Sequence, residues 1–457
     1  MGRARWQALV LVAAVLGLLG GAVAERKPST AVELCLLVVA LVGLAMLGDR
    51  GYPWAIMAMV SAPWYQFTAH SESPTGINQK VICTAIAASV LTPWLWSLAF
   101  GGRRTRPNRA TLLLALLYLG MALLIHSTLG SISAIVTSPV IVGYLFGGIS
   151  FLCARRFVRI EAWPAAAFAG LCVLLALGAF AYVTAPSERD GYFAGYPITY
   201  GALLVGLIPI GLLYAYRRSR SLAVAVGVAS IAMLVFSESR SAWIATGAVL
   251  LVLVALLGRS RNVRALALVG AALVITLGLV LGTGTLHKVI DERLNTRAVN
   301  SQSLTHREWS VGFALGQIGK APVFGAGAPG FSAEESNNRT SLGALDDGYL
   351  SVTLDMGLVG LFAALIPISV ALTVLVRCGL GGVTPPLELS LALGIFGMAV
   401  VTLFYDSFYW SQIDLLFGSM GGALSLRLGA VGVARVRGRR TGEPRLERSL
   451  GLLGSSS

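Results

Sequence analysis

Two adjacent carboxylates, Asp346 and Asp347, stand at the end of a polar stretch that runs from about residue 285 to residue 348. They directly precede an apolar run, so they could cap a helix and complement its dipole. One of them could instead act as a general base at a membrane surface. Because neighbouring carboxylates repel each other, the proton affinity of one is raised, which suits that second role.

A second group of polar residues surrounds Arg240, which lies between Ser239 and Ser241 in a short link between two strongly apolar runs. An arginine here could be a solvated side chain at an interface, paired with Glu238. The small serines also suit close packing or the binding of an oxyanion. Both interpretations of Arg240 stay open at this point.

The polar stretch also contains His306, Arg307 and Trp309. Segment 305–319 predicts an amphipathic helix with Thr305 as its cap and Glu308 at the third helical position, a capping-box arrangement. Trp309, Phe313 and Ile318 would then face the membrane or the protein. The following glycines, Gly325 and Gly327, lack the spacing and the preceding strand of a dinucleotide-binding loop. They indicate a tight turn with close backbone approach.

The elements that must position these residues are apolar helices. Apolar residues make up 56% of the 457 positions and charged residues only 12%, whereas a soluble domain carries about 25% charge. Runs of about 20 apolar residues can span a bilayer as helices. A helix pairs its backbone N–H and C=O groups within its own segment, as lipid requires. The fold class is therefore an all-α polytopic membrane protein with about 12–14 transmembrane helices. The candidate spans are 7–24, 31–48, 52–69, 80–100, 110–126, 132–153, 165–184, 197–216, 221–237, 241–257, 263–284, 349–376, 387–405 and 411–427.

Every second connection between these spans is rich in arginine, as at 103–106, 155–156, 217–220, 259–261 and 435–440. The positive-inside rule places those connections and both termini in the cytoplasm, and the polar stretch outside it. The expected organisation is a transmembrane bundle at 1–284, a large extracytoplasmic catalytic loop at 285–348, transmembrane helices at 349–430 and a basic, disordered cytoplasmic tail at 431–457. The net charge of +14 follows this alternation, so no nucleic-acid partner is expected. Membrane lipids are the expected surroundings.

Three ordered stretches resemble the O-antigen ligase and O-antigen polymerase superfamily of bacterial membrane glycosyltransferases. The first is Ser237-Glu238-Ser239-Arg240-Ser241-Ala242-Trp243. The second is Arg307-Glu308-Trp309, followed by Pro322-Val323-Phe324-Gly325-Ala326-Gly327. The third is Asp346-Asp347-Gly348-Tyr349-Leu350, with Leu354-Asp355-Met356-Gly357 after it.

The resemblance implies a type C glycosyltransferase architecture in the bacterial cytoplasmic (inner) membrane, with its active site on the extracytoplasmic side. The donor would be an undecaprenyl-diphosphate-linked glycan and the acceptor a glycan or a lipid-linked molecule, with no metal or cofactor. Arg240 and Arg307 match the arginines that bind the diphosphate, a role that suits their planar, permanently charged forks. Supporting positions would be Ser239, Ser241, Trp309, Gly325, Gly327 and Tyr349.

The catalytic base is where the chain departs from the family pattern. Many ligases of the family have a His-Asn pair where this chain has Asp346 and Asp347. We favour one of these aspartates over His306 as the base, because their position in the motif matches. The departure leaves a polysaccharide polymerase as well supported as a ligase. A transporter or flippase for a lipid-linked or small substrate is the alternative function, and a membrane scaffold without catalysis is the third.

Overall fold

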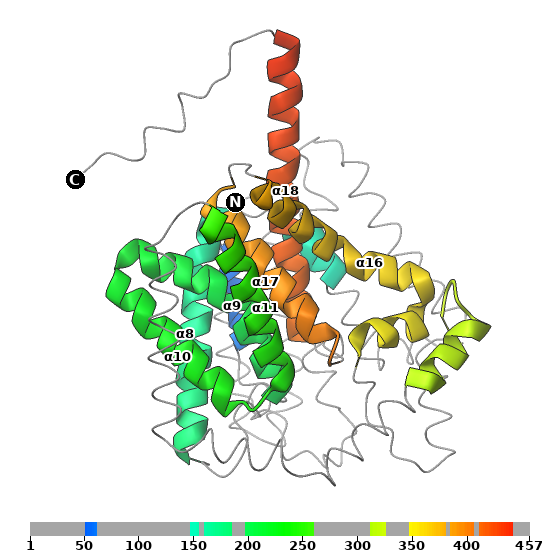
Figure 1. The fold of residues 1–457 in the computed structure, drawn as a ribbon, viewed down its shortest axis with the longest axis horizontal. Helices are drawn as coiled ribbons and strands as arrows, with labels where there is room; N and C mark the ends of the chain where they lie inside the picture. Colours follow the sequence, from blue (N-terminus) through cyan, green and yellow to red (C-terminus); the bar gives the residue numbers. More distant parts are fainter. Residues whose placement is uncertain are drawn as a thin grey trace, which may run out of the picture.

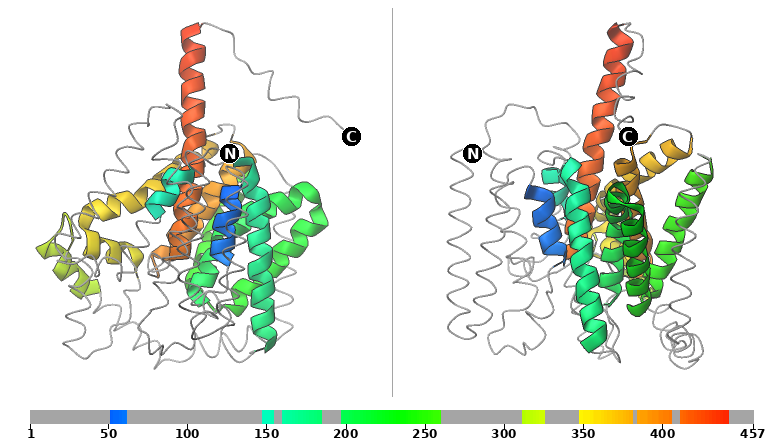
Figure 2. Two further views of the ribbon diagram at one scale, coloured as in Figure 1. Left: turned by 180° about the vertical axis from the view of Figure 1, so that it is seen from behind. Right: turned by 90° about the vertical axis from the view of Figure 1, so that its left-hand side faces the viewer.

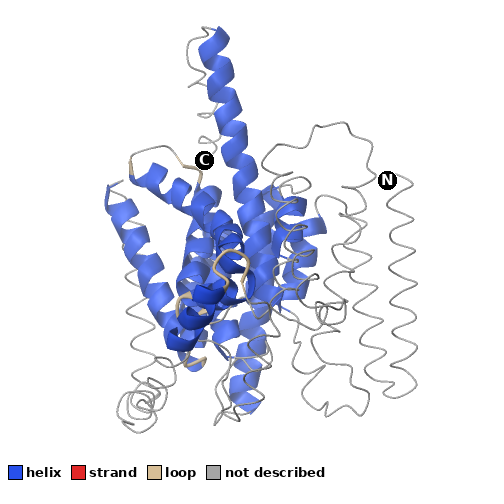
Figure 3. Ribbon diagram, turned by 90° about the vertical axis from the view of Figure 1, so that its right-hand side faces the viewer, coloured by secondary structure: helices blue, strands red, loops and turns tan. Residues whose placement is uncertain are grey.

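The computed structural model describes residues 51–61, 147–154, 160–184, 197–259, 311–325, 347–380, 384–405 and 411–441. Over these ranges all regular secondary structure is helical, as Figure 3 shows. Three helices, Ile160–Thr184, Pro197–Arg218 and Gly348–Gly379, are long and apolar enough to cross a membrane, and three more are apolar but shorter. The described residues therefore have the character of an all-α membrane protein.

The named helices are shown in Figure 1. In chain order they are α3 (Gly51–Ser61), the short 3-10 helix η2 (Ile160–Ala162), α8 (Trp163–Thr184), α9 (Pro197–Arg218), α10 (Arg220–Phe236), α11 (Arg240–Arg259), α16 (Gly348–Gly379), α17 (Pro386–Thr402) and α18 (Ser411–Thr441). Residues 147–154 and 311–320 are helical as well. Helices α8, α9, α10, α11 and α17 coincide with predicted spans to within a few residues at each end. The spans predicted at 7–24, 31–48, 80–100, 110–126 and 263–284 lie outside the described residues.

Helices α9 and α17 form the centre of the described bundle. Helix α9 contacts α8, α10, α11 and α17, and α17 also contacts α11, α16 and α18; Figure 1 shows α9, α11 and α17 side by side. A Cβ atom on Gly394 of α17 would overlap the carbonyl oxygen of Gly206 on α9, and one on Gly397 would overlap the side chain of Val205. Small residues of this kind let membrane helices approach closely and gain van der Waals contact.

Helix α16 differs from the single span predicted at 349–376. Gly357 has φ +65° and ψ −165°, which is not helical, so α16 consists of a short segment at 348–356 and a long segment at 358–379. Figure 1 shows the two segments meeting at a sharp bend. Glycine adopts this conformation without a steric penalty. The surrounding run is apolar, with Asp355 as its only charged residue, so hydropathy predicts one continuous span.

Helix α18 corrects a second prediction. It continues to Thr441, through residues 431–441 that we assigned to a disordered tail; Figure 2 shows it extending beyond the other helices. No proline interrupts 411–441. Residues 442–457 lie outside the described part of the chain.

Candidate functional site

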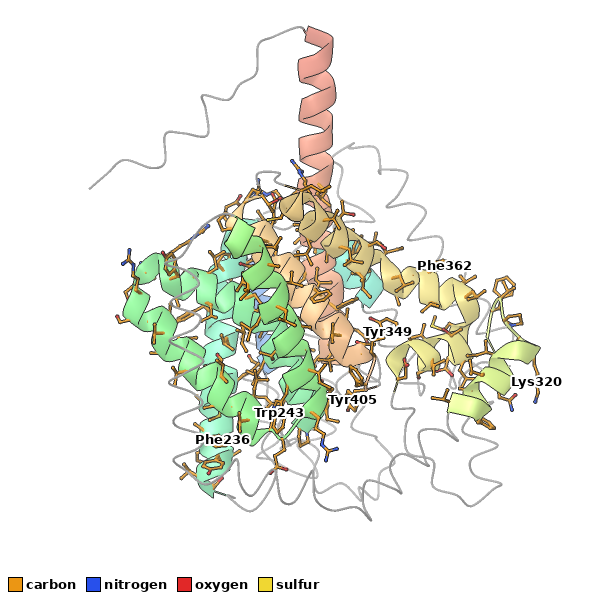
Figure 4. All side chains as sticks on the ribbon, in the orientation of Figure 1. Phe236, Trp243, Lys320, Tyr349, Phe362 and Tyr405 are labelled. Atoms are coloured by element: carbon orange, nitrogen blue, oxygen red, sulfur yellow. The ribbon has the colours of Figure 1, made fainter. Side chains whose placement is uncertain are left out.

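One end of the bundle carries the starts of α9, α11 and α16 and the end of α17. The hydroxyl groups of Thr199, near the start of α9, and Tyr405, just after α17, lie 3.3 Å apart in a hydrogen bond. The Tyr349 hydroxyl, at the start of α16, donates to the carbonyl oxygen of Ala399 on α17 at 2.9 Å. Figure 4 shows Trp243, Tyr405 and Tyr349 towards this end of the bundle. We call it the site end.

The start of α11 joins the same end through Gly201 of α9. A Cβ atom on Gly201 would lie 2.7 Å from Cβ of Ala242 and 3.1 Å from Cβ of Ser239. The two helices therefore meet with no room for a side chain between them. Through α9, the turn that carries Arg240 is linked to Tyr405 and so to the end of α17, against which α16 begins.

The serines around Arg240 pack and cap rather than form an open oxyanion site. Ser239 is fully buried, and its Oγ accepts from the backbone N–H of Ala242 at 3.4 Å and lies 3.2 Å from Oγ of Ser241. The preceding Ser237 is also buried, and its Oγ donates to the carbonyl oxygen of Leu234 at 2.8 Å. Of the two roles that the sequence left open for these serines, the described geometry favours close packing.

Arg240 itself is exposed and is the first residue of α11. A cation at a helix N-terminus is unfavourable, because the first turn already carries partial positive charge from unpaired backbone N–H groups. Nor does the first turn of α11 contain an acidic residue. An anion bound here would interact favourably both with the guanidinium group and with the helix dipole.

Asp347 is the N-cap of α16. Its Oδ1 accepts from the backbone N–H groups of Tyr349, at 2.9 Å, and Leu350, at 3.1 Å. The capping role that the sequence offered for this aspartate is therefore present. Burial raises the pKa of the Asp347 carboxyl above its ordinary value near 3.8, although the two hydrogen bonds act in the opposite direction. The described hydrogen bonds use Oδ1 only, so Oδ2 takes no part in holding the helix start.

The polar stretch reaches the bundle through a joint between two glycines, one on each segment. Gly325 has φ +77°, and a Cβ atom there would lie 2.5 Å from the backbone of Asp355 and Met356; a Cβ atom on Gly357 would overlap the backbone of Val323. The backbone N–H groups of Leu358 and Val359 donate to the carbonyl oxygens of residues 322 and 323, at 2.9 and 3.3 Å. Gly325 thus has the tight turn and close backbone approach that the sequence predicts. We call this contact the glycine joint.

The helix before the joint, 311–320, overlaps the predicted amphipathic helix at 305–319. Its Ala314 is buried against Leu354 of α16, and Ile318 packs beside them. Ile318 therefore faces the protein, one of the two surroundings that we expected for it. The predicted cap at Thr305 lies outside the described residues.

The structure thus brings the Arg240 turn and the Asp347 cap to the same end of the bundle. Of the other predicted site residues, His306, Arg307, Trp309, Gly327 and Asp346 lie outside the described residues. Three positions that hold this end together, Thr199, Gly201 and Tyr405, were not predicted from the sequence. Their only signal was a polar or small residue near the end of an apolar run.

Comparison with known proteins supports the resemblance. No curated protein matches the chain, but the family model described as O-antigen ligase matches residues 224–365. This range contains the Arg240 turn, helix 311–320, the glycine joint and the start of α16. This match supports glycosyl transfer of the ligase or polymerase kind, with lipid-linked glycans as substrates, in a membrane. Residues 224–365 of this chain are thus similar to the O-antigen ligase family.

Proposed function

We propose that this protein transfers a glycan from a polyprenyl diphosphate to an acceptor hydroxyl group on the extracytoplasmic face of the membrane. It would act as a cell-surface polysaccharide polymerase or as an O-antigen ligase. One observation carries the proposal: the contacts through Gly201, Thr199, Tyr405 and Tyr349 bring the exposed Arg240 and the Asp347 cap to one end of the bundle. Both residues lie in the segment that matches the family.

Arg240 would bind the diphosphate of the donor. Its guanidinium fork can contact two phosphate oxygens at once and stays charged at any physiological pH. In the transition state, negative charge grows on the departing diphosphate, and a fixed cation there stabilises it. The N-terminal ends of α9, α11 and α16 carry partial positive charge and belong to the site end, so they would add to that stabilisation.

Asp347 would act as the base. The acceptor oxygen attacks the anomeric carbon of the donor, the bond from that carbon to the diphosphate oxygen breaks, and the diphosphate leaves with the electron pair. The hydroxyl proton passes to the carboxylate. A base works best when its pKa lies near the working pH, and burial moves the pKa of Asp347 in that direction. Oδ1 fixes the carboxylate to the helix start while Oδ2 can accept the proton.

The remaining roles rest on the family resemblance. Arg307 would be the second diphosphate-binding residue, and Asp346 and His306 are the other two candidates for the base. The architecture would be that of a type C glycosyltransferase, with residues 285–348 forming the extracytoplasmic loop over the site and no metal or cofactor. Trp309 and Gly327 would support that loop.

The distribution of charge supports an extracytoplasmic site in the cytoplasmic membrane. Arg217 and Arg218 end α9, and Arg377 lies in the last turn of α16, at the opposite end of the bundle from the site end. Arg427 of α18 pairs there with Glu161, at 2.8 Å. Arginine concentrates on the cytoplasmic side of membrane proteins. The N- and C-termini would then both be cytoplasmic, as the alternation of charge along the sequence predicts.

Arginine replacements test the proposal. Arg240→Ala should abolish product, and Arg240→Lys should restore only part of it, because lysine lacks the bidentate fork. Arg220→Ala is the matched control: Arg220 also opens an apolar helix and is also exposed, but at the opposite end of the bundle. The measurement is the amount and the size of lipid-linked glycan in membranes that contain equal amounts of folded protein. Normal product from Arg240→Ala would remove the assigned role.

The same assay separates the competing functions. Loss of a polymerase leaves single repeat units on the lipid, and loss of a ligase leaves long unattached chains. The transporter alternative gains some support from the broken helix α16, since transporters use discontinuous helices. In transporters such breaks lie near the bilayer midplane, whereas the break at Gly357 lies near one end of α16. For a transporter, lipid-linked glycan would stay on the cytoplasmic side when the protein is absent.

A further inference from the structure

An exposed apolar surface lies on the far side of the glycine joint from the bundle. On helix 311–320 and the turn after it, four large apolar side chains are exposed, and two more follow on α16. Leu315 is 56% exposed, Phe324 52% and Phe362 66%. We call this surface the apolar ledge; its residues are Val311, Leu315, Val323, Phe324, Leu358 and Phe362.

On its helix, the ledge borders the packed face rather than lying opposite it. Ala314 is fully buried and packs with Leu354 and Ile318, which fixes the inward face. Val311 and Leu315, four residues apart, form the neighbouring row of the helix, and glycines follow on the side beyond them: a Cβ atom on Gly312, or on Gly316, would meet nothing within 4 Å. Helix 311–320 therefore has a packed row, Ala314 and Ile318, and directly beside it an uncovered apolar row, Val311 and Leu315.

The ledge is also continuous with a surface that must face lipid. The glycine joint ties the turn at 322–323 to the backbone of Leu358 and Val359. From Leu358 to Gly379 the long segment of α16 is about 33 Å in length at the helical rise, which matches the hydrocarbon core of about 30 Å. Further along the same segment, Leu372 and Val376 are exposed as well. The joint therefore holds the ledge at the level where this span enters the membrane.

Charge along the ledge agrees with that level. Segment 311–325 contains no acidic residue, and Lys320 is its only charged residue. Lys320 is exposed at the end of the helix. Figure 4 shows Lys320 at the edge of the molecule away from α8, and Phe362 on α16 nearer the bundle. A lysine at such a place can keep its stem on apolar surface while its ammonium group reaches lipid phosphates.

We propose that helix 311–320 and the turn at 321–324 lie in the outer membrane–water interface, with the apolar ledge inserted among lipid acyl chains. A helix in this position buries its apolar face about 5–10 Å into the boundary between headgroups and acyl chains. The partner is the bilayer itself, and the inference holds whether or not the protein transfers glycans. It gives the lipid bilayer a direct contact with the segment that the glycine joint connects to the site end.

Spin labels report this contact directly. A nitroxide is attached at Leu315→Cys or Phe324→Cys, with the native cysteines replaced, and the protein is placed in nanodiscs of phosphatidylethanolamine and phosphatidylglycerol. Power saturation then compares collisions with oxygen, which concentrates in lipid, and with a water-soluble nickel chelate. Leu251→Cys on α11, 73% exposed on a bilayer-facing helix, is the lipid control. Ser219→Cys, exposed in the turn between α9 and α10, is the aqueous control.

Labels at 315 and 324 should favour oxygen over the nickel chelate, as the label at 251 does. A preference for the nickel chelate, like that of the label at 219, would overturn the proposal. Low access to both reagents would also overturn it, since protein rather than lipid would then cover the ledge. The variants need no glycan product for this measurement, so failure of the proposed enzyme function and failure of this inference are distinguishable.

Discussion

At the glycine joint, the effect of adding a single methyl group can be predicted; Gly357→Ala adds it. Gly357 has φ +65° and ψ −165°, a region that residues with a side chain essentially do not occupy. The added Cβ would overlap the backbone of Val323. Because the obstruction is backbone on both sides, no side-chain rotation relieves it. Either the segment at 322–323 must separate from α16, or the bend in α16 must change.

The size of the effect follows from the contacts that are lost. Holding alanine in this conformation costs about 1–3 kcal/mol. Separation also removes the hydrogen bonds from Leu358 and Val359 to residues 322 and 323, each worth about 1 kcal/mol. The docked joint should therefore weaken by at least about 3 kcal/mol, which corresponds to at least about a 100-fold change in its opening equilibrium.

Hydrogen exchange of the purified protein in nanodiscs measures that equilibrium. The amide protons of Leu358 and Val359 should exchange at least about 100-fold faster in Gly357→Ala than in the wild type. Gly316→Ala is the matched control, because nothing lies within 4 Å of a Cβ atom there and alanine favours a helix over glycine by about 1 kcal/mol. It should leave exchange at the joint unchanged. Unchanged exchange in Gly357→Ala would refute the reasoning about the joint.

Two further replacements separate structure from chemistry at the site end. Asp347→Asn should keep the α16 start, because asparagine caps as well as aspartate, yet lose product; wild-type product from this variant would exclude Asp347 as the base. Burial raises the pKa of Asp347, so wild-type product formation should decline as the pH falls through that raised value. Over the same pH range the folded state should gain stability, because it takes up the proton at a higher pH than the unfolded chain does. Gly201→Ala should push Ala242 away and lower product although Gly201 bears no reacting group, whereas Gly247→Ala, with open space around it, should not; equal product from the two variants would show that this contact does not position Arg240.

The helices were the most predictable part of the molecule. The ends of α9, α10 and α11 fall within a few residues of the predicted spans, because an abrupt change from apolar to polar residues marks where a chain can leave lipid. The predicted end of α18 was wrong, because the helix continues past the point where the apolar residues end. Hydropathy marks where a chain leaves lipid, and a helix can continue beyond that point into water.

Within the site, residue types were predictable and their surroundings were not. The sequence marked Arg240 and Asp347 by their charge in an apolar chain. It could not show that Ser239 and Ser241 pack and cap the helix start, because the groups that their hydroxyls bond to depend on how α11 begins. It also could not show that Asp347 uses only one carboxylate oxygen to cap α16.

The sequence alone predicted the apolar helices that the structure describes and which residues could do chemistry, because suitability for lipid is a property of each segment's own composition. Only the tertiary structure decided which of those residues meet. Arg240 and Asp347 are far apart in the chain, and they share one end through Gly201, Thr199, Tyr405 and Tyr349. The bend at Gly357 was decided in the same way. Its conformation is possible for glycine anywhere, but the backbone of residues 322–323, packed against it, makes glycine necessary here.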